Sequence, residues 1–328
     1  MKIELNTHER CMIDFAAQHP DVLVLSADLG SSCEVKKFRA TYPDRYLTMG
    51  IAEQNMCSWA AGLAREGYRP FLHTFSVFLY RRILDQLEMS VAYPNLPVVF
   101  VGFVPGITTP GGVTHQSIND VGVLRTVPNM AIFDIGDATE IEGVLKLAYD
   151  YNGPVFIRML RKEVPRLFPA SEPMQFNRAR VLSEGDDVLI LSSSICTEEA
   201  MRATAALKER GVSVQHMHVS TLKPFTDPTI VEALKKVKYG VVTIENQYNI
   251  GGLSSAVSEV IAENGIGKRL VKIGLPGYPH GASKMYLMKK YGIDAMHLVQ
   301  AVEELTGRDL HLTEQDLAEE RFVDFLEV

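Results

Sequence analysis

The sequence predicts an α/β protein with two α/β domains, each built on a mostly parallel sheet. Short apolar runs that suit buried strands alternate with helix-length segments along most of the 328 residues. A stretch punctuated by prolines separates two such alternating blocks. Apolar residues make up 46% of the chain and charged residues 22%, a balance that allows a substantial core. Alternation of this kind favours right-handed βαβ units with helices on both faces of the sheet.

The first block contains five predicted strands and the helices that connect them. The segment Asn152-Gly153-Pro154 fits a helix end before the last of these strands. The predicted strands are Val22–Ser26, Pro70–Phe75, Val98–Val104, Met130–Asp134 and Val155–Arg158, and the predicted helices are Glu53–Arg65, Ser117–Thr126 and Ala138–Tyr149.

The alternation lapses between Glu163 and Arg180. Pro165, Pro169 and Pro173 lie four residues apart there, a spacing that neither a helix nor a central strand tolerates. We therefore expect a first domain over residues 1–162, a linker over 163–180 and a second domain over 181–328.

The second block repeats the alternation of strands and helices. From Ser283 onward the sequence predicts helices that end in an acidic tail. The strands expected in this block are Asp187–Ser193, Val212–Val219, Gly240–Glu245 and Leu270–Ile273, and the helices are Thr197–Arg210, Asp227–Lys236 and Gly252–Glu263.

Charge and composition narrow the function classes. The net charge of −7 and the lack of a Lys/Arg block argue against a nucleic-acid surface. No run approaches the ~18 apolar residues of a membrane span, and charges near the N-terminus do not suit a secretory signal. The four cysteines show no C-x-x-C spacing, as expected for reduced thiols. We expect a cytoplasmic protein that binds neither nucleic acid nor membrane.

Three segments combine residues that can carry chemistry. Glu53 opens an Ala-rich helix just after Gly50, although a carboxylate there could also merely complement the helix dipole, worth about 0.3–1 kcal/mol. Phe75 and Phe78 follow a predicted strand, and His115 follows a glycine-rich loop. Open α/β sheets bind ligands beyond the carboxyl ends of their strands, where these segments are expected.

The order and spacing of these segments resemble transketolases. Five segments resemble the pyrimidine-binding domain of that family: GIAEQNM at 50–56, HTFSVFLYRRILDQ at 73–86, GITTPGGVTHQS at 106–117, LRTVPNM at 124–130 and GPVFIR at 153–158. In the second block, Leu222-Lys223-Pro224 and Glu245-Asn246-Gln247 resemble the family's C-terminal domain. The diphosphate-binding signature, Gly-Asp-Gly with a later Asn, is absent, since Gly185-Asp186-Asp187 does not match it. The sequence therefore resembles the smaller subunit of a two-component transketolase.

The resemblance implies thiamine diphosphate as cofactor and assigns residues to it. Glu53 would hydrogen-bond the pyrimidine ring nitrogen and drive the proton transfer that activates the cofactor. Phe75 and Phe78 would pack on the pyrimidine face, with core packing as the alternative for each. His115 would contact the first hydroxyl groups of the ketose donor, and Asp28 would lie near the cofactor unless it only caps a strand-end turn. Arg81 stands where many relatives have a tyrosine, so it is not assigned to the cofactor.

The same resemblance places the anionic end of a sugar phosphate. Ser32 aligns with a position near the substrate phosphate, with local turn capping as the alternative. Arg161 falls where relatives keep a phosphate-binding arginine, and a guanidinium suits phosphate or sulfonate. Arg158 lies three residues earlier and could equally hold the sheet in an ion pair.

The implied assembly needs a second protein. The partner would be the N-terminal transketolase subunit, which carries the diphosphate site and the Mg²⁺ ligands, so no metal site is expected in this chain. Two copies of each subunit would form a heterotetramer with two active sites. The second domain of this chain would support dimerisation.

Two positions depart from ordinary transketolases. The loop Thr109-Pro110-Gly111-Gly112 lacks the carboxylate that binds a donor hydroxyl in relatives, and Val104 replaces a histidine. Loss of such a partner typically costs about 1–3 kcal/mol. We hypothesise a donor that is unusual at C3 or carries another anionic group, such as a branched ketose phosphate or a sulfosugar.

Three other functions remain open. The chain could be the β subunit of a 2-oxo acid dehydrogenase, which shares the fold and the activating glutamate. It could belong to a deoxyxylulose phosphate synthase. It could also be a non-catalytic binding module in which Glu53 is only a helix-start charge.

Overall fold

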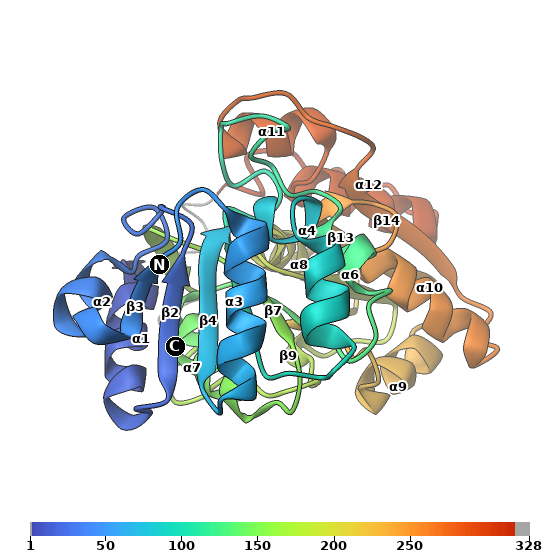
Figure 1. Cartoon of the computed structure of the whole chain (residues 1–328). Helices are drawn as coiled ribbons and strands as arrows, with labels where there is room; N and C mark the ends of the chain where they lie inside the picture. The colour runs from blue at the N-terminus through green and yellow to red at the C-terminus, as the bar shows by residue number, and fades with distance from the viewer. Residues whose placement is uncertain (1, 319–328) are drawn as a thin grey trace.

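The computed structural model describes residues 2–318, and in this range the chain forms two sheets of parallel character and one small antiparallel pair (Figure 1). The seven-stranded sheet has the order β12-β6-β7-β5-β4-β2-β3 and the five-stranded sheet the order β14-β13-β10-β11-β9. Within these two sheets, all strand pairs are parallel except β12–β6 and β9–β11. The prediction of two α/β domains with mostly parallel sheets is confirmed.

Strands of the first sheet alternate their side chains between two hydrophobic layers. Leu23 and Leu25 pack with α3, whereas Val22 and Val24 pack with α1 and α7. The strands of this sheet are β2 (Val22–Ser26), β3 (Tyr46–Thr48), β4 (Arg69–Phe75), β5 (Val99–Phe103), β6 (Ala131–Asp134), β7 (Val155–Met159) and β12 (Thr221–Lys223). The helices around it are α1 (Thr7–Gln18), α2 (Lys36–Thr41), α3 (Glu53–Arg65), α4 (Phe78–Arg81), α5 (Leu84–Gln86), α6 (Asp120–Leu124) and α7 (Ala138–Asp150), with short turns η1 (Pro43–Arg45) and η2 (Leu87–Ala92).

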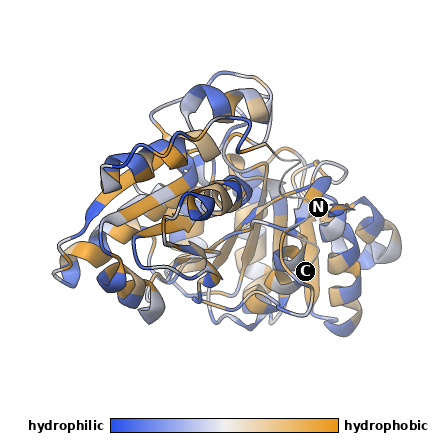
Figure 2. Ribbon diagram, turned by 180° about the vertical axis from the view of Figure 1, so that it is seen from behind, coloured by the Kyte–Doolittle hydropathy of each residue, from blue (hydrophilic) through white to orange (hydrophobic). Residues whose placement is uncertain are grey.

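The second sheet is covered in the same way, and Figure 2 shows the hydrophobic strands inside and more hydrophilic helix faces outside. One layer of its core joins α8 and α12 to the strands. The strands are β9 (Arg180–Ser183), β10 (Val188–Ser192), β11 (Val214–His218), β13 (Gly240–Tyr248) and β14 (Arg269–Leu275). The helices are α8 (Cys196–Glu209), α9 (Pro228–Lys236), α10 (Leu253–Glu263), α11 (Lys284–Tyr291) and α12 (Ala295–Thr306). None of the helices within residues 2–318 combines the length and apolarity needed to cross a membrane.

The structure differs from the predicted elements in several places. The helix α1 and the strand β1 (Lys2–Leu5) were not predicted, and the helix expected over Ser117–Thr126 is confined to α6. Residues 163–180 include β8 (Glu163–Arg166), which pairs antiparallel with β1 and places Pro165 opposite Ile3. A proline is compatible with such a two-stranded edge. The domain boundaries themselves stay a prediction, and the tail beyond residue 318 lies outside the described residues.

The two domains share both a sheet and a buried charge cluster. Strand β12 comes from the second block yet pairs with β6 of the first. Next to β6, Arg158 on β7 is fully buried. It donates to Asp120 Oδ2 at 3.0 Å and to Asp134 Oδ1 at 2.8 Å. It also donates to the carbonyl oxygens of Ser117 and Asn246, at 3.3 and 3.1 Å. Burial alone would lower the pKa of Arg158, but Asp120 and Asp134 raise it above its usual range.

We predict that Arg158→Met destabilises the chain by about 3–5 kcal/mol, because two buried carboxylates lose their counter-charge. Urea denaturation measures the change. The control is Lys146→Met, which removes a largely exposed ion pair with Asp150 and should have little effect. Equal stability losses in the two variants would contradict the prediction.

Candidate active site

The candidate site lies beyond the carboxyl ends of adjacent strands of the first sheet. Phe75 ends β4, Asp28 lies two residues after β2, and Arg161 lies two residues after β7. His115 stands in the connection from β5 to α6. Because these strands are parallel, their carboxyl ends meet at one edge and bring the four residues to it.

Glu53 is the first residue of α3, and its side chain is only 4% exposed. The turn before the helix is fixed by the hydrogen bond from Met49 N to Ser26 O at 2.9 Å. Gly50 has a φ of 71°, which a glycine adopts without strain. Met56 and Ala60 anchor the buried side of α3 in the core. The local sequence thus places a carboxylate at a helix start beside the strand ends.

Arg82 is a site residue that the sequence analysis missed. Its Nη1 donates to Glu53 Oε1 at 2.5 Å, and its Cζ lies 3.7 Å from the centroid of the Phe78 ring. The side chain remains 41% exposed, so the ion pair borders solvent. The four-residue spacing between Phe78 and Arg82 was the available signal, because side chains at this spacing share a helix face.

Three rings form one partly open surface next to this ion pair. The centroids of Phe75 and Phe78 lie 5.9 Å apart with an interplanar angle of 30°. The His115 ring stands edge-on to both, with centroid distances of 5.9 Å to each. His115 Nδ1 lies 2.9 Å from Thr114 Oγ1. All three rings are half-buried, so each keeps an accessible part.

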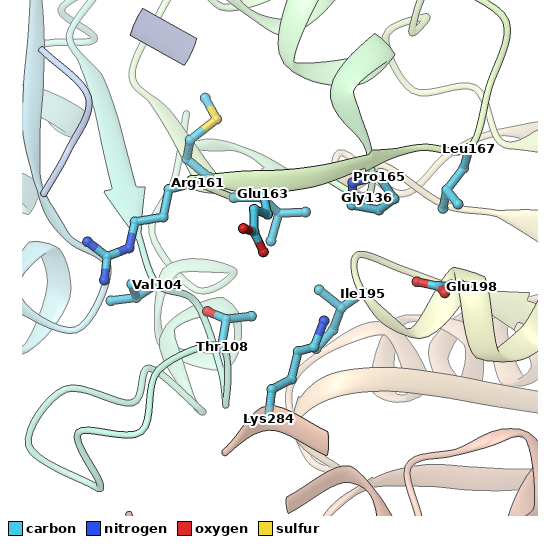
Figure 3. A pocket seen from close by; sticks show the side chains of 12 residues that line it. Val104, Thr108, Gly136, Arg161, Glu163, Pro165, Leu167, Ile195, Glu198 and Lys284 are labelled. Atoms are coloured by element: carbon cyan, nitrogen blue, oxygen red, sulfur yellow. The ribbon is translucent and has the colours of Figure 1, made fainter. Parts of the chain in front are cut away.

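Arg161 connects the aromatic surface to Ser32. Its Nη1 donates to Ser32 O at 2.9 Å, and its Cζ lies 5.4 Å from the Phe75 centroid. A cavity of about 200 Å³ lies beside Arg161, and Figure 3 shows Glu163 and Lys284 reaching into it. Lys284 comes from the second domain, at the start of α11.

Asp28 and Arg158 differ in their availability. Asp28 is exposed and has a φ of 59°, a left-handed conformation that aspartate tolerates better than most residues. Arg158 is enclosed by the cluster described above and has no exposed surface. It cannot contact a substrate in this structure, which corrects the substrate-binding prediction for this residue and leaves the ion-pair alternative.

Val104 begins a strained segment. It is buried and has a φ of 54°, which is unfavourable for a β-branched residue by roughly 1–3 kcal/mol. Asn246 holds the residues that follow, since its Oδ1 accepts from Ile107 N at 3.0 Å and its Nδ2 donates to Pro105 O at 3.2 Å. A Cβ on Gly106 would lie 2.2 Å from Asn246 Oδ1, so this close approach requires glycine.

These residues fit the pyrimidine half of thiamine diphosphate. A carboxylate at the start of α3 can bind a ring nitrogen, and two neighbouring phenylalanines offer a surface on which a heteroaromatic ring can stack. Within residues 2–318, no three His, Cys, Asp or Glu side chains are grouped as metal ligands.

Comparison with known families covers most of the chain. Residues 6–166 match the transketolase pyrimidine-binding domain, and residues 177–298 match the transketolase C-terminal domain. The 6-deoxy-6-sulfo-D-fructose transketolase subunit SqwH of Clostridium sp. strain MSTE9 is 35% identical over 312 residues, covering 92% of this chain and 94% of that protein. The 1-deoxy-D-xylulose-5-phosphate synthase of Symbiobacterium thermophilum is 33% identical over 302 residues, and these span 90% of this chain but only 46% of that protein.

Solved structures agree with this grouping. A split-gene transketolase, described as an inactive β4 tetramer, superposes with a TM-score of 0.85 at 34% identity and covers 92% of this chain and 97% of that chain. Transketolase from Leishmania mexicana shares the fold, with a TM-score of 0.77 at 23% identity over 96% of this chain and 47% of that chain.

The chain therefore belongs to the transketolase family, whose members use thiamine diphosphate. Within the family it corresponds to the C-terminal, pyrimidine-binding subunit of a two-component transketolase. The family resemblance seen in the sequence is confirmed, and the alternative of a 2-oxo acid dehydrogenase β subunit is not favoured.

We predict energetic coupling between Glu53 and Arg82. Arg82→Met should lower the free energy of unfolding by about 1–2 kcal/mol, because it leaves a buried carboxylate unpaired. In a Glu53→Gln background the same substitution should have little effect. A double-mutant cycle by urea denaturation measures the coupling. Equal losses in both backgrounds would show that Arg82 acts through Phe78 alone.

Proposed function

We propose that this chain is the smaller subunit of a split, thiamine diphosphate-dependent transketolase. It would transfer a two-carbon ketol unit from an anionic ketose to an aldose acceptor. The observation that carries the proposal is the convergence of a buried carboxylate, two phenylalanines and a histidine at the edge of a parallel sheet.

Each residue has a distinct role in this proposal. Glu53 holds the pyrimidine ring nitrogen and moves a proton there. Arg82 donates to Oε1 of Glu53. The other carboxylate oxygen, Oε2, can then bind the ring nitrogen. Phe75, Phe78 and Asp28 orient the ring and border it. The bound cofactor supplies the electron sink for breaking the carbon–carbon bond.

The donor site would lie on the other side of the aromatic surface. His115 contacts the first hydroxyl groups of the donor, and its edge-on position against Phe75 and Phe78 holds the imidazole beside the cofactor ring. Arg161 and Ser32 receive the anionic end of the sugar. The guanidinium of Arg161 is already held by Ser32 O, which limits its motion and leaves its other donors for an anion.

A partner subunit would cover the face around Glu53. Large apolar side chains are exposed there: Ile51 lies two residues before α3, Trp59 lies on α3 and is 53% exposed, and Tyr93 follows η2 and is 82% exposed. The π-helix η2 packs against α3, so the elements that carry Trp59 and precede Tyr93 are neighbours. Clustered exposed apolar groups favour a protein interface. We assign this face to the N-terminal subunit, which would bring the diphosphate site and the Mg²⁺ ligands into an assembly of two copies of each subunit.

The cysteines support a reducing compartment. All four are free, and burial raises the pKa of Cys11 to about 11 and that of Cys57 to about 12, so both stay protonated at neutral pH. Such unreactive thiols need no oxidising environment. We place the enzyme in the cytoplasm.

We predict that Glu53→Gln lowers kcat by about 100-fold or more in the reconstituted pair, because proton transfer at the pyrimidine ring is lost. Ketol transfer is measured after the chain is mixed with its N-terminal subunit and thiamine diphosphate. Glu66→Gln is the matched control, since Glu66 is exposed at the other end of α3. Undiminished turnover by Glu53→Gln would refute the proposal.

The loop over residues 104–118, which we call the substrate loop, points to an unusual donor. It offers no carboxylate to a donor hydroxyl, and Val104 is apolar where ordinary relatives have a histidine. The guanidinium of Arg161 can donate hydrogen bonds to the oxygens of a sulfonate in the same way as to those of a phosphate. The similar SqwH subunit is named for a sulfonated ketose. We propose a sulfosugar or a branched ketose phosphate as the donor.

We predict that kcat/KM for such a donor, tested with 6-deoxy-6-sulfofructose, exceeds that for xylulose 5-phosphate by about tenfold or more. Arg161→Gln should raise KM for both anionic donors but leave the neutral donor erythrulose unchanged, because only the anionic donors carry a group for Arg161 to bind. A strong preference for xylulose 5-phosphate would overturn the substrate proposal without affecting the role of Glu53.

A further inference from the structure

The second domain contacts the substrate loop at its start, at its tip and at its end. The loop comprises residues 104–118 and carries His115. At its start, Asn246 bonds to Ile107 and Pro105 as described above. At its end, Tyr248 N donates to Ile118 O at 2.6 Å. In Figure 1 the teal loop that leads to α6 passes beside α11.

The tip of the loop meets residues 277–281, a segment between β14 and α11 that we name the clasp. Two glycines face each other at this contact. A Cβ on Gly281 would lie 2.7 Å from Pro110 O and 3.4 Å from Gly112 N. A Cβ on Gly112, whose φ is 71°, would lie 3.3 Å from Gly281 N. The two backbones therefore touch, and a side chain on Gly281 would push them apart.

Arg81 binds the loop and borders the clasp. Its Nη1 donates to Val113 O at 2.9 Å and its Nε donates to Tyr80 Oη at 2.8 Å. Its Cζ lies 6.0 Å from the centroid of the Tyr278 ring. A cation at this range from a tyrosine ring is attracted to it. This arrangement gives a role to an arginine that stands where relatives have a tyrosine.

The position of His115 depends directly on this tip. His115 N donates to Gly112 O at 2.9 Å. A Cβ on Gly111 would lie 2.9 Å from His115 Cβ, so the backbone of the tip is packed against the histidine itself. A shift of Pro110, Gly111 and Gly112 would therefore move the imidazole relative to Phe75 and Phe78.

We propose that the clasp is a positioning element by which the second domain sets the place of His115 and thus the donor site. This inference rests on the proposed function for the role of His115. Gly281 is the most important residue of the clasp in this proposal, because its backbone lies against Pro110 and Gly112 of the substrate loop. A displacement of the order of 1 Å in a substrate-positioning group can reduce activity by about 100-fold.

The test compares Gly281→Ala with Gly277→Ala. Both glycines lie in the clasp outside the left-handed region, but a Cβ on Gly277 would meet no atom within 4 Å. In the reconstituted pair, Gly281→Ala should lower kcat/KM for the ketose donor by about tenfold, with the affinity for thiamine diphosphate unchanged within about twofold. Gly277→Ala should behave as wild type. Unchanged kinetics in Gly281→Ala, or a parallel loss of cofactor affinity, would overturn the proposal.

Hydrogen exchange gives a readout that needs no turnover. In the isolated chain, Gly281→Ala should increase amide exchange in residues 109–116 by about threefold or more, and Gly277→Ala should not. Tyr278→Ala should act in the same direction as Gly281→Ala, since it removes the ring beside Arg81. If the wild-type pair transferred no ketol unit from any ketose, the proposed function would fail while hydrogen exchange still tested the clasp. Unchanged exchange in Gly281→Ala would overturn the clasp alone.

Discussion

The buried cluster around Arg158 is the interaction on which the arrangement of this site depends. One guanidinium joins the end of β7 to Asp120 at the start of α6 and to Asp134 at the end of β6. It also binds the carbonyl oxygen of Asn246 in the second domain. Buried charges are tolerated only when they are paired and hydrogen-bonded, so the relative positions of these segments are tightly constrained. The substrate loop leads into one of these segments, α6, and Arg158 also binds the carbonyl oxygen of Ser117 near the end of the loop.

The site divides into two regions with different supports. The region around Glu53, Phe75 and Phe78 is built entirely from the first domain, at the edge defined by its parallel strands. The region around His115 is also held from outside that domain, by Asn246 at one end of the loop and by the clasp at its tip, beside the bond from Arg81 of the first domain. The donor contacts thus have a support in the second domain that the cofactor contacts lack. Such separation suits a fold that supports many substrates on a common cofactor.

Sequence reasoning predicted the parts that depend on local pattern. The strands β2 and β4 were predicted because apolar runs mark buried strands, and α3 was predicted from its glycine, its first-turn carboxylate and its alanines. The position of Glu53, Phe75, Phe78 and His115 near one edge followed from the parallel sheet. The prediction of two α/β domains needed no more than these patterns.

The parts that were missed depend on contacts between distant residues. The pairing of Glu53 with Arg82 spans 29 positions and is decided by how α3 and α4 are oriented. Arg158 is enclosed because the segments that carry Asp120, Asp134 and Asn246 pack around it. No local sequence pattern predicts packing between such distant segments. Strand β12 is only three residues long, which is too short to stand out as an apolar run. It pairs with β6 of the first domain, and no local sequence pattern predicts that pairing. The sequence of the clasp indicates a loop, but it does not predict that this loop contacts residues 110–112.

The pairing of β12 with β6 has a consequence for how a gene of this family can be divided. Gene fission between the two domains would remove β12 from the first product and leave β6 as an open edge. Unprotected edges of this kind promote association with other chains, so both products of such a division would be at risk of aggregation. A break ahead of both domains leaves the shared sheet whole. Because β12 closes the edge of the first sheet, we expect the two domains to be kept on one polypeptide.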